Sequence, residues 1–182
     1  MVAGDDGMVL VDPGPGTAAA AAGLRPVSDV LLTHCHGQPG QAGASARDAG
    51  ARLHYHPAEA SLLGGRAAEA DVLVRDGDLV AGAFQVVATP GHSPGHVCYF
   101  HTPTGTLFAG HALVVAGGEL RLGARPAAAE VPAARRSIAR CLELPIEHVC
   151  PASRRPLSEG AGVKALAVRS RLLTGARWPL LG

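Results

Sequence analysis

Residues 31–40 read Leu-Leu-Thr-His-Cys-His-Gly-Gln-Pro-Gly, in which a short apolar run leads directly into two histidines and then into a turn. We interpret residues 29–33 as a buried strand and the histidines as the start of the loop after it. His34 and His36 are two residues apart, so in extended backbone both side chains would point to one face, with Cys35 on the other. A strand end holds such side chains in place while the loop exposes them. This stretch is therefore the first candidate for a functional site.

Two more histidines follow apolar runs in the same way. One lies in Thr-Pro-Gly-His-Ser-Pro-Gly-His at residues 89–96, where Pro and Gly favour a tight loop, and the other follows Leu-Phe-Ala-Gly at residues 107–110. Neutral imidazole is a common ligand for Zn²⁺ and other transition metals. If the strand ends converge, the sequence predicts a metal site built from four histidines: His34, His36, His92 and His111.

The order of the expected elements indicates one α/β domain over residues 1–182. In the first part of the chain, short apolar strands alternate with stretches of helical composition, and later strands dominate. The predicted strands are 8–11, 29–33, 52–56, 71–74, 83–88, 96–101, 105–109 and 147–150. The predicted helices are 17–24, 40–51, 57–63, 126–144 and 159–173. We expect helices outside and sheets within, in four layers if each half contributes a sheet and its helices.

The composition restricts the class of function. The chain has 182 residues with 16 basic and 15 acidic side chains, a net charge of +1. This balance argues against a nucleic-acid or membrane-surface binder, because such proteins need an excess of positive charge. No stretch approaches the roughly 18 apolar residues of a membrane span, the N-terminus lacks a signal-peptide pattern, and the four cysteines form no Cys-x-x-Cys pair. We therefore predict a soluble cytoplasmic protein that binds neither nucleic acid nor a membrane surface.

Five ordered motifs resemble those of the metallo-β-lactamase-fold hydrolases, and most closely those of the glyoxalase II-like branch. They are Val-Leu-Val-Asp-Pro-Gly at 9–14, the stretch 31–40, Thr-Pro-Gly-His-Ser-Pro-Gly-His-Val at 89–97, Leu-Phe-Ala-Gly-His at 107–111 and Val-Cys-Pro-Ala-Ser at 149–153. The resemblance implies a four-layer αββα sandwich, with the metal site along one edge between the sheets. Because the chain begins close to its first motif, we expect the first sheet to lack an N-terminal edge strand or two.

The resemblance also implies which residues bind metal. In the family's slots for the first metal this sequence has His34, His36 and His92, so that ligand set is intact. The slots for the second metal hold other residues, namely Gln38, Pro39, Ser153 and, in place of the bridging carboxylate, His111. Gln and Ser are poor ligands, and the Pro side chain offers no ligand atom. The expected cofactor is one Zn²⁺ per chain in a degenerate dinuclear site, with Fe²⁺ as the alternative.

Three hypotheses for function remain open. A mononuclear metal-dependent hydrolase would direct a metal-bound water against an ester, thioester or lactone, with His111 as fourth ligand or proton carrier. The alternatives are a catalytically impaired pseudoenzyme that serves as a binding or regulatory module, and a mononuclear iron oxygenase resembling the persulfide dioxygenases. We expect Asp12 to brace the metal loop by hydrogen bonds, His96 to support the site or pack, and Cys35 to be a structural thiol. Exposed sheet edges would allow a homodimer.

Overall fold

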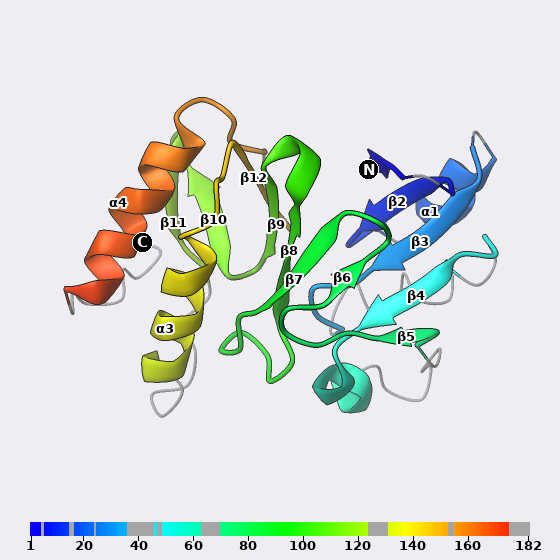
Figure 1. Ribbon diagram of the computed structural model, residues 1–182, viewed down its shortest axis with the longest axis horizontal. Coiled ribbons are helices and arrows are strands. Elements are labelled where there is room, and N and C mark those ends of the chain that lie inside the picture. The colour runs from blue at the N-terminus through cyan, green and yellow to red at the C-terminus, as the bar shows by residue number, and fades with distance from the viewer. Residues whose placement is uncertain are drawn as a thin grey trace.

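The computed structural model describes residues 1–4, 6–14, 17–23, 25–35, 46, 49–62, 70–123, 131–152 and 155–174. Its strands form two five-stranded sheets and a separate hairpin (Figure 1). The N-terminal sheet, in spatial order, consists of β1 (Val2–Ala3), β2 (Met8–Val11), β3 (Val27–Leu31), β4 (Arg52–Tyr55) and β5 (Val72–Leu73). Its strands β2 to β5 are parallel to their neighbours, and β1 pairs antiparallel with β2.

The C-terminal sheet has the spatial order β12, β9, β8, β7, β6. Its members along the chain are β6 (Leu79–Val80), β7 (Phe84–Ala88), β8 (Val97–His101), β9 (Thr106–Gly110) and β12 (His148–Pro151). The hairpin consists of β10 (Leu113–Ala116) and β11 (Glu119–Leu122). Only β12 pairs parallel with its neighbour in this sheet, because it arrives through a helix rather than a tight turn.

Helices cover the outer faces of the two sheets (Figure 1). The helix α1 (Thr17–Ala22) contacts β3, while α3 (Val131–Cys141) and α4 (Ala161–Leu173) pack on each other and on the C-terminal half. The described residues also include two short 3₁₀ helices, η1 (Pro57–Leu62) after β4 and η3 (Thr102–Thr104) between β8 and β9. Among the described helices, none is long and apolar enough to cross a membrane.

Buried side chains of the described residues form three hydrophobic cores, which lie between successive layers of helices and sheets. One core fills the space under α1, and another lies between the C-terminal sheet with its hairpin and the pair α3 and α4. The central core joins the two sheets through Val9, Leu31, Val74, Val80, Phe84, Val86, Val97, Tyr99 and Phe108. The order is helix, sheet, sheet, helix, so the αββα sandwich implied by the motifs is confirmed.

Several boundaries differ from the predicted ones for physical reasons. The strand β3 ends at Leu31, two residues early, because the chain leaves the sheet there to pack Thr33 and His34 between the two halves. His34 and Cys35 therefore do not alternate as strand residues would, since neither residue lies in a strand. The predicted helix at 57–63 is the 3₁₀ helix η1, and the strands β1, β6, β10 and β11 were not predicted.

Other predictions lie wholly or partly outside the described residues. The predicted helix at 40–51 is such a case. Of the predicted helix at 126–144, residues 131–144 are described, and the helix α3 ends among them at Cys141. From the sequence we expect the first sheet to lack an N-terminal edge strand or two. Beyond β2, the described residues form a single edge strand of two residues, β1.

Candidate metal centre

Three of the four candidate ligands meet at one place. His34 lies three residues beyond β3, His92 lies in the loop between β7 and β8, and His111 directly follows β9. One ring nitrogen of each lies within 4.8 Å of the others. The ring centroids of His92 and His111 are 4.5 Å apart, and those of His34 lie 4.8 Å from His111 and 5.0 Å from His92. The three histidines thus form one cluster, although 77 positions separate the first from the last in the sequence, from 34 to 111.

The cluster suits a transition-metal ion. Zn²⁺ binds imidazole nitrogen at about 2.0–2.1 Å, which places the nitrogens of a tetrahedral site about 3.3 Å apart. A shift of about 1.5 Å, within the range of side-chain rotation, would bring the three nitrogens from their present separation to that spacing. Three imidazoles without a carboxylate favour Zn²⁺, Fe²⁺ or a similar ion over Mg²⁺ or Ca²⁺. The fourth candidate, His36, and the second-metal positions Gln38, Pro39 and Ser153 lie outside the described residues.

A hydrogen-bond relay orients His34. The Asp12 carboxylate accepts the Thr33 backbone N–H at 2.8 Å and the Thr33 hydroxyl at 2.6 Å. Because that hydroxyl donates to Asp12, its oxygen can accept the Nδ1–H of His34, 2.9 Å away. This tautomer leaves Nε2 of His34 with its lone pair available for a metal. The expectation that Asp12 braces the metal loop by hydrogen bonds is therefore confirmed.

Thr33→Val should weaken metal binding while leaving the size of the side chain nearly unchanged. The substitution removes the hydroxyl that connects Asp12 to His34, so the ring loses the partner that selects its tautomer. Loss of such a supporting partner typically costs 10- to 100-fold in metal affinity, and we expect about tenfold for Zn²⁺. Competition with a chromophoric chelator measures this, with Thr33→Ser as the control that keeps the hydroxyl. Equal affinities for the two variants would contradict the relay.

The ionisation of Asp12 should make the stability of the chain depend on pH. Burial raises the pKa of its carboxyl from 3.8 to about 6, although the two hydrogen bonds from Thr33 lower it. Between these values the folded chain binds a proton that the unfolded chain has released, so the contribution of Asp12 to stability falls as the pH rises from 4 to 6. Asp12→Asn removes this titration. The melting temperature of the metal-free Asp12→Asn chain, relative to wild type, should therefore rise over that range, and a constant difference would contradict this.

His96 supports the cluster from behind. It is fully buried, its Nδ1 lies 2.8 Å from the Thr89 hydroxyl, and its Nε2 accepts the backbone N–H of His111 at 3.1 Å. Both ring nitrogens are thus engaged by protein groups, which makes His96 a support for His111. The supporting role expected from the sequence agrees with this arrangement. Thr89 and Thr33 were not recognised in the sequence, because an isolated threonine carries no signal of the ring that it will contact.

Cys35 is turned into the protein. It is buried in the core under α1, and burial raises the pKa of its thiol far above the ordinary value. A thiol that stays protonated is neither a nucleophile nor a metal ligand at neutral pH. The expected structural role of Cys35 is consistent with this environment.

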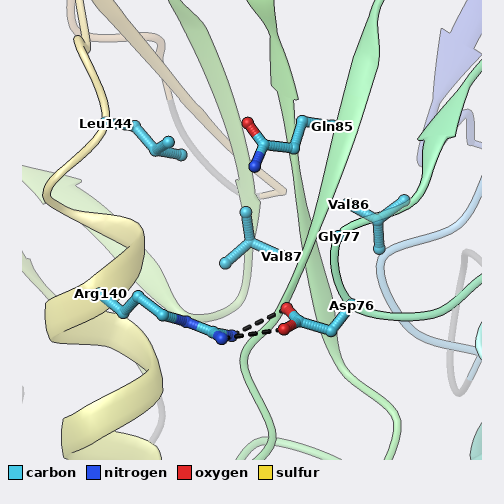
Figure 2. A pocket seen from close by; sticks show the side chains of 7 residues that line it. All are labelled: Asp76, Gly77, Gln85, Val86, Val87, Arg140 and Leu144. Atoms are coloured by element: carbon cyan, nitrogen blue, oxygen red, sulfur yellow. Dashed lines mark hydrogen bonds and ion pairs between the residues drawn. The ribbon is translucent and has the colours of Figure 1, made fainter.

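A hollow of about 110 Å³ between α3 and β7 contains none of the clustered histidines (Figure 2). Figure 2 shows the guanidinium of Arg140 facing the carboxylate of Asp76, with two hydrogen bonds of 2.8 Å. The two charges compensate each other, and the Asp76 carboxylate also accepts the backbone N–H of Ala88. This arrangement ties α3 to the edge of the sheet, and such an exposed ion pair contributes about 0–1 kcal/mol. We assign the hollow a structural role.

Comparison with known proteins agrees with the fold, and the region that matches a known family includes the cluster. The sequence profile of the metallo-beta-lactamase superfamily matches residues 1–153, a range that includes all three clustered histidines. The hydroxyacylglutathione hydrolase of Yersinia pestis (strain Pestoides F) is 36% identical over 116 residues, which are 60% of this chain and 43% of that protein. The matched region therefore covers less than half the length of that relative.

Solved structures show the same similarity over more of the chain. TTHA1623 in a di-iron-bound form has a TM-score of 0.70 and 26% identity, covering 94% of this chain and 90% of that one. The B3 metallo-beta-lactamase BLEG-1 has a TM-score of 0.64 and 28% identity, covering 87% of each chain. The resemblance to this superfamily, and to its glyoxalase II-like branch, that the motifs indicated is confirmed.

Proposed function

Because the chain belongs to the metallo-β-lactamase superfamily, we propose that it is a mononuclear metal-dependent hydrolase with His34, His92 and His111 as metal ligands. The observation that carries the proposal is the meeting of these three imidazoles, within 4.8 Å, inside the region that matches the superfamily. When bound, the ion supplies Lewis acidity and a water acidic enough to serve as a nucleophile near neutral pH. His36, two residues after His34, is the further candidate ligand from the sequence.

The residues around the cluster have separate tasks in this proposal. The Thr33 hydroxyl, which donates to Asp12, would accept the Nδ1–H of His34 and so leave Nε2 available to bind an ion. His96 holds the backbone of His111 in place. Of the two roles open to His111, the distance of its ring nitrogen from those of His34 and His92 favours that of a ligand over that of a separate proton carrier.

The replaced second-metal positions support one ion per chain. An imidazole at residue 111 bears no negative charge to bridge two cations, whereas a carboxylate does. We propose Zn²⁺, with Fe²⁺ as the alternative that the di-iron form of TTHA1623 makes relevant. The proposed substrates are esters, thioesters or lactones, and the name of the hydroxyacylglutathione hydrolases favours a thioester among these. The four free cysteines support a reducing, cytoplasmic setting.

Metal analysis and hydrolysis together test the proposed function. The chain, purified without chelator, should contain about one zinc or iron ion and should hydrolyse a small acyl thioester. Chelation should abolish the hydrolysis, and adding back one equivalent of Zn²⁺ should restore it. A chain that binds no ion from a Zn²⁺ solution would refute the proposal, and one ion without hydrolysis of any ester, thioester or lactone would favour the pseudoenzyme instead.

A further inference from the structure

One buried carboxylate joins the two loops that carry the candidate ligands. Glu59 lies in η1, the teal turn of helix at the bottom of Figure 1, and its side chain is fully buried, at 0% exposure. Its Oε2 accepts the backbone N–H of Cys35 at 2.8 Å, and its Oε1 accepts the backbone N–H of Gly95 at 2.7 Å. Each oxygen thus holds a different loop. Hydrogen bonds from backbone N–H groups to an ionised carboxylate are stronger than bonds between neutral groups.

The two amides lie next to the metal cluster. Cys35 directly follows His34, and Gly95 lies between His92 and His96 in the chain. The Gly95 backbone fits closely against its neighbours, because a Cβ at this position would lie 2.7 Å from Nδ1 of His56 and 2.9 Å from Cγ of Glu59. The loop that carries His92 therefore packs closely against the side chain of Glu59. The Glu59 side chain therefore connects this loop directly to the one that carries His34.

We propose that Glu59 is a positioning residue that sets the separation of His34 and His92 and thereby the affinity and geometry of the metal site. It acts through the backbone amides of Cys35 and Gly95. The inference rests on the proposed function to the extent that a metal binds these histidines. The alternative is that Glu59 only stabilises the fold, in which case its loss would lower the stability of the chain and leave the bound metal unchanged.

Glu59→Gln separates these two roles, since Gln has the same shape but only one acceptor oxygen. Its NH₂ group would face one of the two backbone N–H groups, so one loop is released while the other stays attached. We expect the dissociation constant for Co²⁺ and for Zn²⁺ to rise about tenfold, the lower end of the range for residues that orient metal ligands. The visible d–d spectrum of the Co²⁺-loaded chain should also change, because it reports the geometry of the ligands.

Asp71→Asn is the matched control. The Asp71 carboxylate also accepts a backbone N–H, that of Leu53 at 2.8 Å, but Leu53 lies in β4 rather than in a histidine loop. This variant should lower thermal stability, while its Co²⁺ affinity stays within twofold of wild type and its Co²⁺ spectrum is unchanged. A folded Glu59→Gln chain with wild-type Co²⁺ affinity and spectrum would overturn the proposal. If Glu59→Gln does not fold, Glu59→Asp, one methylene too short to hold both loops, replaces it with the same expected and contrary results.

Hydrogen exchange of the metal-free chain tests the inference independently of the proposed function. The amides of Cys35 and Gly95 should be protected in wild type and in Asp71→Asn, and at least one of them should exchange faster, by tenfold or more, in Glu59→Gln. Unchanged protection of both amides would overturn the role of Glu59 in joining the loops. A wild-type chain that binds neither Co²⁺ nor Zn²⁺ would refute the proposed function and the effect on metal geometry together, while the exchange data would still decide whether Glu59 joins the loops.

Discussion

His92→Ala is expected to reduce the metal content of the purified chain from about one ion to none. His92 supplies one of the three imidazoles that meet in the cluster, and its ring lies 4.5 Å from His111 and 5.0 Å from His34. Zinc-finger peptides bind Zn²⁺ through four ligands with roughly 10–16 kcal/mol, which gives the scale of the contribution of one ligand. Loss of one of three or four ligands should therefore remove about 3 kcal/mol or more, which weakens binding over a hundredfold.

The measurement for His92→Ala is metal content after gel filtration, followed by titration with Zn²⁺ against a chelator. The control is His148→Ala, which removes an imidazole at the start of β12, outside the cluster. That variant should keep its metal. Unchanged metal content in His92→Ala would refute the ligand assignment, and equal losses in both variants would show that the effect is not specific to the cluster.

Gly110→Ala is expected to destabilise the chain by about 3 kcal/mol and to disrupt the site. Gly110 has a φ of +51°, in the left-handed region, where a side chain costs roughly 1–2 kcal/mol. A Cβ at this position would lie 2.5 Å from the Thr33 hydroxyl oxygen and 2.6 Å from Nε2 of His96. Crowding in a packed interior adds roughly 1–3 kcal/mol. Because Thr33 and His96 support His34 and His111, metal affinity should fall as well.

Gly117→Ala is the matched control for this substitution. Gly117 has a φ of +60°, but a Cβ there would meet no atom within 4 Å. This variant therefore has only the backbone cost, about 1–2 kcal/mol, and should keep the metal affinity of wild type. Urea unfolding of the two variants gives the difference in their free energies of unfolding. An equal loss in both would show that Gly110 is needed only for its φ and not for the close approach of Thr33 and His96.

Much of the framework follows from local patterns. The predicted strands at 8–11, 52–56 and 83–88 correspond to β2, β4 and β7 with nearly the predicted bounds, because short segments in which apolar or aromatic side chains recur favour a strand. The hairpin around residues 102–105 was also predicted, since Pro and Gly favour a turn at fixed positions. The strands β10 and β11 were missed, although Gly117-Gly118 between two short apolar segments is a signal for a hairpin turn.

Only part of the candidate site could be predicted from local sequence patterns. His34, His92 and His111 were identifiable, because each follows an apolar run and imidazole has a specific chemistry as a ligand. The residues that hold them gave no such signal. Glu59 is 24 positions from one of its hydrogen-bond partners and 36 from the other, and Asp12 is 21 positions from Thr33. Nothing in the neighbouring sequence distinguishes a buried carboxylate of this kind from an exposed one.

The sequence by itself determined the alternation of strands and helices, the superfamily and the residues with metal-binding chemistry, because these properties belong to short segments and to single side chains. The tertiary structure decided that three imidazoles meet, that the Thr33 hydroxyl lies between Asp12 and His34, and that Glu59 joins two loops. These facts depend on distances between segments that are remote in the chain, and such distances are set by how the two sheets pack around the central core. A carboxylate acquires its role only when that packing encloses it and brings backbone N–H groups to both of its oxygens.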